Sequence, residues 1–208
     1  MMQDQVRSVQ DDIAYMRALA HEGRHTPQVG GAILVAAGLV FGLAAAIHFL
    51  IDYGILRLPP VAYLVVWGSA MVVFIASLVV QIRAVDRKPG ALSPVNQATG
   101  SAWMGVGLAS FVMSLSIGIV AYQVQNPVLA LVFPSLIFAL YGTGWAVSAT
   151  MSRQAWQWRL AIGAWIAAPL IAIMISTPFV WLAYAAGILV FALVPGIILM
   201  RQEPVEVI

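Results

Sequence analysis

Long apolar runs alternate with short polar connections along most of this chain. Six runs follow a polar N-terminal stretch, and each is close to the ~20 residues that a helix needs to cross a membrane. They predict spans at about 29–51, 61–82, 100–122, 128–151, 156–175 and 179–200. We therefore expect an all-α, polytopic membrane protein, with a six-helix transmembrane bundle of three antiparallel hairpins over residues 27–201.

Prolines mark most of the predicted boundaries. A capping side chain precedes a proline, which suits the first turn of a helix, at Thr26-Pro27, Ser93-Pro94, Asn126-Pro127 and Thr177-Pro178. Pro59-Pro60 opens the second span. The fifth span lacks this signal, and Ser152 is predicted as its N-cap residue.

The first 26 residues are predicted to form a cytoplasmic amphipathic helix. Apolar side chains recur there at spacings of three and four, at Val6, Val9, Ile13, Met16 and Ala20. The segment holds four acidic and three basic residues, whereas helices that adsorb to lipid prefer a polar face rich in Lys and Arg. We therefore expect the face formed by Val6, Val9, Ile13 and Met16 to pack under the bundle or to bind a protein partner.

Charge strengthens the membrane assignment and predicts orientation. Only 9% of the 208 residues are charged, compared with about 25% in a soluble domain. Nine of the ten Lys and Arg residues lie in the N-terminal segment, the second and fourth connections and the C-terminal end, which leaves Arg57 alone in the opposing connections. This bias predicts a cell (inner) membrane protein whose N-terminus and C-terminus are cytoplasmic, with residues 202–208 as a tail.

Composition and motifs argue against several function classes. The basic residues form no stripe suited to nucleic acid, and the absence of cysteine excludes disulfides and thiolate metal sites. Residues 21–25 spell HExxH, but they lie beside Gly23 and Thr26-Pro27, where the predicted helix ends. We therefore predict no catalytic, cofactor-binding or metal-binding residues and no enzyme activity.

One polar group lies near the outer end of the first span. His48 and Asp52 are four residues apart, on one face of a helix, and Tyr53 and Arg57 follow. An imidazole beside a carboxylate suits proton transfer or a two-ligand contribution to a metal site. We favour an interfacial polar pair, because Asp52 lies at the helix end, where water or headgroups solvate it.

Prolines inside three spans predict unpaired carbonyl groups. They are Pro134, Pro169 and Pro195, and they free the carbonyls of Ala130, Trp165 and Phe191. Such groups allow a hinge or bind a cation, although neighbouring side chains satisfy them more often. Pro169, near the middle of the fifth span, is the best hinge position.

Small residues predict where helices pack closely. Gly38 and Gly42 form a GxxxG pattern in the first span, and a second stripe in the third span comprises Gly107, Ser110, Ser114 and Gly118. Packing within the bundle is the favoured interpretation, and the seam of a homo-oligomer is the alternative.

The sequence resembles one group of proteins through motifs of low specificity, and this resemblance bears only on the location of the protein in the cell. The segment Ala18-Leu19-Ala20-His21-Glu22-Gly23-Arg24, then Pro27, Gly30 and Gly31, and the late Leu193-Val194-Pro195-Gly196 resemble uncharacterised six-span inner-membrane proteins of bacteria. That resemblance implies no activity. We expect an accessory or regulatory component that acts through protein partners, with a small-solute or ion permease built on proline-broken helices as the alternative and a membrane enzyme as a weaker one.

Overall fold

The computed structural model describes residues 27–203, so the predicted partner-binding face of Val6, Val9, Ile13 and Met16 lies outside the described residues. Its helices are α2 (Gly31–Asp52), α3 (Val61–Val85), α4 (Pro94–Gln123), η1 (Pro127–Val132), α5 (Phe133–Ser152), α6 (Ala155–Ile173), α7 (Val180–Ile188), η2 (Leu189–Leu193) and α8 (Val194–Gln202). Six stretches are long and apolar enough to cross a membrane, the last of them built from α7, η2 and α8. The predicted six-span all-α bundle is confirmed.

Local polar chemistry sets several helix ends. Helix α4 begins at Pro94, which confirms the boundary that Ser93-Pro94 predicts, although the apolar run itself begins only at residue 100. Ser93 Oγ accepts the amide of Asn96 at 3.3 Å and caps a polar first turn. The prediction that Ser152 caps the fifth span is wrong. Arg153 turns into the left-handed region (φ 57°), Gln154 becomes the N-cap residue, and the Ser152 hydroxyl donates to Gln157 Oε1 at 3.0 Å.

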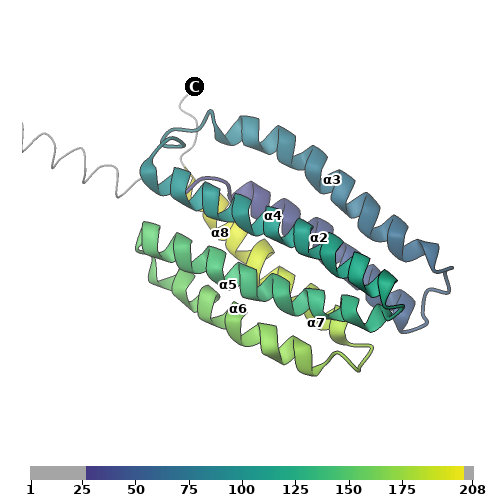
Figure 1. Ribbon diagram of the computed structural model, residues 1–208. Coiled ribbons are helices and arrows are strands. Elements are labelled where there is room, and N and C mark those ends of the chain that lie inside the picture. The colour runs from purple at the N-terminus through teal and green to yellow at the C-terminus, as the bar shows by residue number, and fades with distance from the viewer. Residues whose placement is uncertain (1–26, 204–208) are drawn as a thin grey trace, which may run out of the picture.

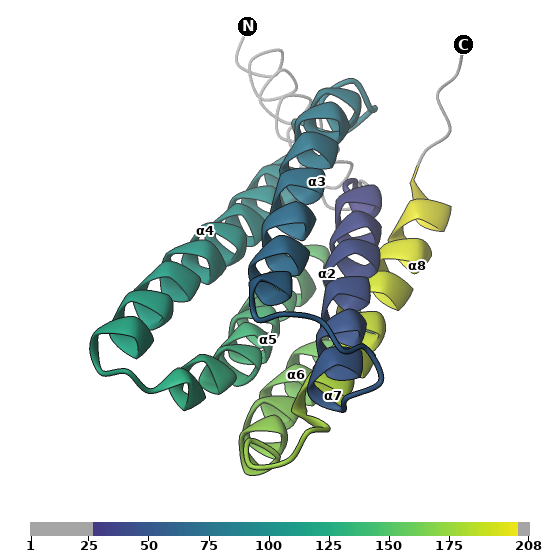
Figure 2. The same ribbon diagram turned by 90° about the vertical axis from the view of Figure 1, so that its right-hand side faces the viewer.

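The spans lie side by side, and two of them organise the rest (Figure 1). Helix α2 packs against α3 on one side and against α7, η2 and α8 on the other. Helix α5 packs most extensively against α6 and also against α4. Helix α3 forms one edge of the bundle in Figure 1, and α4 forms another in Figure 2.

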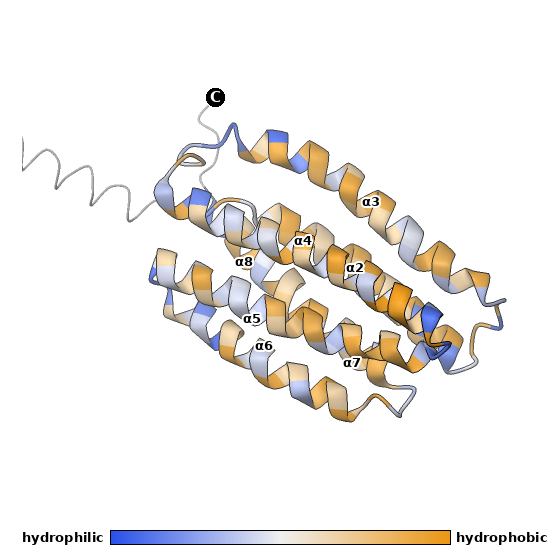
Figure 3. Ribbon diagram, viewed as in Figure 1, coloured by the Kyte–Doolittle hydropathy of each residue, from blue (hydrophilic) through white to orange (hydrophobic). Residues whose placement is uncertain are grey.

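Large side chains fill the interior, whereas apolar side chains also cover the outside. Phe138, Trp145 and Ile188 are fully buried between α5 and the sixth span. Hydrophobic residues extend along all of the helices (Figure 3), and many large ones, such as Leu64, Val72 and Leu108, are exposed. Helix α3 fully buries only Ala70, so the face that it turns away from α2 is left for lipid or for another protein.

Glycines bring α2 into backbone contact with the sixth span. A Cβ atom added at Gly38 would lie 2.7 Å from Leu193 Cβ and 2.8 Å from Leu193 Cα. One added at Gly31 would lie 2.6 Å from the carbonyl oxygen of Gly196. Gly42 faces Leu189 with ordinary van der Waals spacing. The first small-residue pattern thus packs inside the bundle, where side chains would hold the two helices apart.

The second small-residue stripe, on α4, has a different environment. Gly107 and Gly118 would meet nothing within 4 Å if a Cβ were added. Ser110 donates back to the carbonyl of Val106 at 2.7 Å, and Ser114 is exposed. This stripe therefore makes little use of its small residues within the described bundle.

These two environments predict opposite effects of the same substitution. Gly38→Ala is expected to cost about 1–3 kcal/mol of stability, because the added methyl group meets the Leu193 backbone. Gly107→Ala, also in a helix, is expected to be neutral or stabilising by up to about 1 kcal/mol. Thermal unfolding of the two purified variants in the same detergent measures the difference, and equal melting temperatures would contradict it.

Candidate functional site

His48 is held by partners on both of its ring nitrogens. Its Nδ1 atom accepts a hydrogen bond of 2.9 Å from Trp67 Nε1 on α3. Its Nε2 atom lies 3.5 Å from Asp52 Oδ2, one turn later on α2. Because Nδ1 is the acceptor, a neutral ring carries its proton on Nε2, which points it towards the carboxylate.

Aromatic side chains surround this imidazole and join it to other helices. The ring of Trp181, on α7, stacks on His48 with centroids 3.9 Å apart and an interplanar angle of 19°. The Tyr63 ring lies 4.5 Å from it, and the Tyr63 hydroxyl donates to Asp52 Oδ1 at 2.6 Å. We call His48, Asp52, Tyr63, Trp67 and Trp181 the outer cluster. It links α2, α3 and α7 at one end of the bundle.

The geometry of the outer cluster favours a structural crosslink over metal binding. A histidine that ligates a metal generally donates its second ring N–H to an acceptor, whereas the second nitrogen of His48 accepts from Trp67. Among residues 27–203, no group of three or more His, Asp or Glu side chains is placed to hold a metal ion. The Nδ1 lone pair of His48 is thus used by Trp67 in this arrangement.

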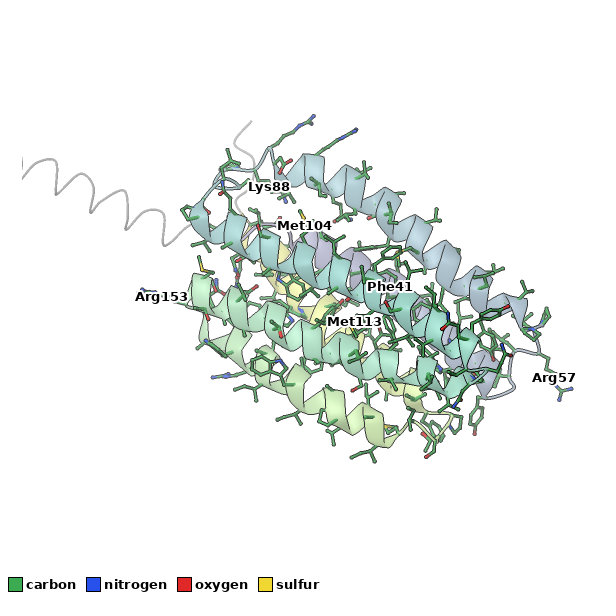
Figure 4. The ribbon with its side chains drawn as sticks, viewed as in Figure 1. Phe41, Arg57, Lys88, Met104, Met113 and Arg153 are labelled. Atoms are coloured by element: carbon green, nitrogen blue, oxygen red, sulfur yellow. The ribbon has the colours of Figure 1, made fainter. Side chains whose placement is uncertain are left out.

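The other two residues predicted for the outer polar group are placed differently. Tyr53 packs with Phe49 and Phe179, at ring-centroid distances of 5.4 and 5.8 Å. Arg57 projects from the α2–α3 connection, at the opposite end of the bundle from Lys88 and Arg153 (Figure 4). The structure thus unites His48 with Asp52 and adds Tyr63, Trp67 and Trp181, which the sequence reading did not select.

A buried polar chain lies at the other end of the bundle, and sequence reasoning missed it. Gln157 on α6 is 0% exposed, and its Nε2 donates to Gln28 Oε1. Ser152 donates to Gln157 Oε1 at 3.0 Å, and Gln28 Nε2 reaches Thr99 Oγ1 on α4 at 3.5 Å. We call Gln28, Thr99, Ser152 and Gln157 the inner chain. It ties the segment before α2 to α4, α5 and α6.

Asn96 fixes the entry of the chain into the bundle. Its Nδ2 donates to the carbonyl oxygens of Pro27 at 3.0 Å and Gly90 at 2.9 Å. Its Oδ1 accepts the amide of Val29 at 3.2 Å. One buried carboxamide thereby joins the start of α4, the α3–α4 connection and the segment before α2.

Glu203 caps the first described helix from the far end of the chain. Its Oε1 accepts the amides of Gly30 at 2.8 Å and Gly31 at 2.9 Å, and its Oε2 pairs with Lys88. A carboxylate at a helix N-terminus is favoured by the unpaired amides and by the helix dipole. The isolation of this acid in the sequence could have pointed to a structural role, because no Asp or Glu occurs between Asp86 and Glu203.

Two of the three carbonyl groups predicted to be freed by intraspan prolines, those of Phe191 and Ala130, accept hydrogen bonds from neighbouring groups. Before Pro195 the helix widens into the π-turn η2, and the Phe191 carbonyl accepts from Trp145 Nε1 at 2.9 Å. The Ala130 carbonyl, freed by Pro134, accepts the amide of Phe133. Helix α6 continues through Pro169, and the carbonyl just before that proline, of Ala168, accepts from Ser135 Oγ at 2.8 Å.

A shallow, open depression lies on the outer surface of α5. It is lined by Thr143, Ala146, Val147, Thr150 and Met151. Both threonine hydroxyls donate to carbonyls one turn back, Thr143 to Ala139 at 3.2 Å and Thr150 to Ala146 at 2.8 Å. The depression therefore presents mainly methyl and methylene groups.

Comparison with known proteins adds no assignment: no family model, no curated protein and no solved structure matches the chain. The resemblance to six-span bacterial inner-membrane proteins therefore stays a prediction. The residues themselves carry the functional argument.

The outer cluster predicts a specific stability effect. Trp67→Phe removes the donor to His48 Nδ1 but keeps an aromatic ring, and it is expected to cost about 1 kcal/mol. Trp158→Phe on α6, where the indole is 42% exposed, is the matched control and is expected to change stability by less than about 0.5 kcal/mol. Thermal unfolding in one detergent compares them, and an equal loss in both variants would refute the crosslink.

From the hydrogen bonds of the inner chain we expect a larger loss of stability for one substitution and a partial recovery when a second substitution is added. Gln157→Leu leaves Gln28 Oε1 and the Ser152 hydroxyl without their partner, and we expect a loss of about 1–3 kcal/mol. Adding Gln28→Leu removes one orphaned group and is expected to restore part of the stability. Gln97→Leu, on the exposed surface of α4, is the control. A double variant less stable than the sum of the single losses would contradict the pairing.

Proposed function

We propose that this chain is an accessory or regulatory component of a membrane and that it acts through contacts with protein partners rather than by catalysis. The observation that supports the proposal is the use of its polar side chains. In the described bundle, the polar side chains of the outer cluster and the inner chain form hydrogen bonds with one another across helices. They serve as crosslinks between α2, α3, α4, α6 and α7.

The strongest chemical candidate illustrates this point. A general base needs a lone pair directed at its substrate. The Nδ1 lone pair of His48 is occupied by Trp67, and the Nε2 position faces Asp52. The Asp52 carboxylate in turn accepts from Tyr63. These contacts support a structural role for the His48–Asp52 pair.

The surface of the bundle supports a role in binding. Only 6% of the most apolar window of α3 and 11% of that of α4 is buried, compared with 39% for the fourth and sixth spans. Helices held at the edge in this way have broad faces for lipid or for the helices of another protein. A protein partner or a second copy of this chain would find these faces accessible.

The proposed location is the cell (inner) membrane, with both termini in the cytoplasm. The support is the distribution of basic residues, nine of ten in alternate connections and terminal segments. In the structure, Lys88 and Arg153 lie at one end of the bundle and Arg57 at the other (Figure 4). The cytoplasmic end would then also carry the N-terminal segment with its apolar face.

The proposal is tested on that face. Ile13→Asp places a charge in the apolar stripe of the predicted N-terminal helix, and Ser8→Asp places the same charge away from it. We expect full-length Ile13→Asp to lose, by at least about tenfold, the proteins that crosslink to the wild type in native membranes, while Ser8→Asp retains them. Crosslinking followed by quantitative mass spectrometry measures the loss. Identical sets from both variants would sink the proposal.

A further inference from the structure

A tryptophan of α6 packs against α5 next to the first turn of the depression. The Trp165 ring lies directly over Gly142, where an added Cβ would approach the ring to 2.2 Å, and its Nε1 donates to the Ala139 carbonyl at 3.2 Å. Trp158 lies two turns earlier on the same face of α6. Because α5 and α6 run antiparallel, Trp158 lies at about the level of the last turns of α5. Its indole is 42% exposed, as suits a residue at the membrane interface.

Two exposed arginines, Arg153 and Arg159, lie close to the connection between α5 and α6. Thr150 and Met151 line its last turn, and Arg153 ends α5 two residues later. Arg159 is exposed near the start of α6. No acidic residue occurs anywhere from Arg87 to Gln202, so this end of α5 and α6 carries basic charge without an acid in its own segment. An anionic headgroup is the complement of such a surface.

The size and chemistry of the depression favour one occupant. Residues 143–151 cover about 12 Å of helix, less than half of the ~30 Å that the contact face of a second transmembrane helix would span. The threonine hydroxyls are turned to their own carbonyls, so the lining offers no free polar hydrogen to an occupant. An acyl chain suits this short apolar surface, and a phosphate suits the two arginines.

We propose that the α5 depression is a binding site for an anionic phospholipid, whose acyl chain lies along Thr143, Ala146 and Thr150 and whose phosphate pairs with Arg153 and Arg159. The α5–α6 pair would thereby carry a lipid as a fixed part of its surface. This proposal is independent of the protein partner proposed above, because it concerns a different surface and a different ligand.

The test is lipid binding to the purified full-length protein in a non-ionic detergent, followed by native mass spectrometry. Phosphatidylglycerol and phosphatidylcholine of equal chain length are the two probes. Each arginine is expected to contribute about fivefold, so Arg153→Asn with Arg159→Gln should weaken phosphatidylglycerol binding about 25-fold and leave phosphatidylcholine binding within about twofold. Asparagine is chosen at residue 153 because it tolerates the left-handed backbone there.

Two further variants distinguish lipid binding at this depression from a general attraction of anionic lipid to the positive charge of the protein. Arg57→Gln in the α2–α3 connection, combined with Arg83→Gln in the last turn of α3, removes the same net charge from other elements, and it should leave both affinities within about twofold. Ala146→Leu fills the depression and should weaken both lipids alike. Should the double arginine variant fail to fold, Arg159→Gln alone should still show the loss of about fivefold. Equal losses in the two arginine pairs, or no preference of the wild type for phosphatidylglycerol, would overturn the proposal.

Discussion

The close approach of α2 to the sixth span is the contact on which the bundle depends. Gly31, Gly38 and Gly196 remove the side chains that would otherwise separate the two backbones. In a bilayer, apolar side chains gain little by moving from lipid to protein, so such close van der Waals contact is a main source of helix association. Helix α2 then becomes the surface on which α3, α7 and α8 assemble.

Polar contacts complete this arrangement at its two ends. The outer cluster attaches α3 to α2 through Trp67 and Tyr63, which matters because α3 buries only one residue elsewhere. The inner chain and Asn96 hold the segment before α2 against α4 and α6. Between the ends, apolar packing is supplemented by single bonds such as that from Trp145 to the Phe191 carbonyl. The buried and half-buried polar side chains described above therefore mainly join helices to one another.

Hydrophobic runs alone predicted the number and approximate limits of the spans, because a membrane requires length and apolarity of every crossing helix. The apolar run alone begins too late for α4, since a capped polar turn at Ser93 extends the helix beyond it, but the Ser93-Pro94 pair predicted the correct start. The four-residue spacing of His48 and Asp52 identified this pair, but no pattern identified Trp67, Trp181 or Gln157. Those partners come from other helices, and no local spacing encodes which helices will be neighbours.

The bond from Glu203 to the amides of Gly30 and Gly31 has a consequence for biosynthesis. The two ends of this contact are separated by 172 and 173 residues of chain. Synthesis proceeds from the N-terminus, so α2 enters the membrane before either its glycine-matched partner or its cap exists. Until the last span is made, the amides at the start of α2 depend on water, lipid headgroups or another protein. The first helix of the bundle is therefore the last to reach its final environment.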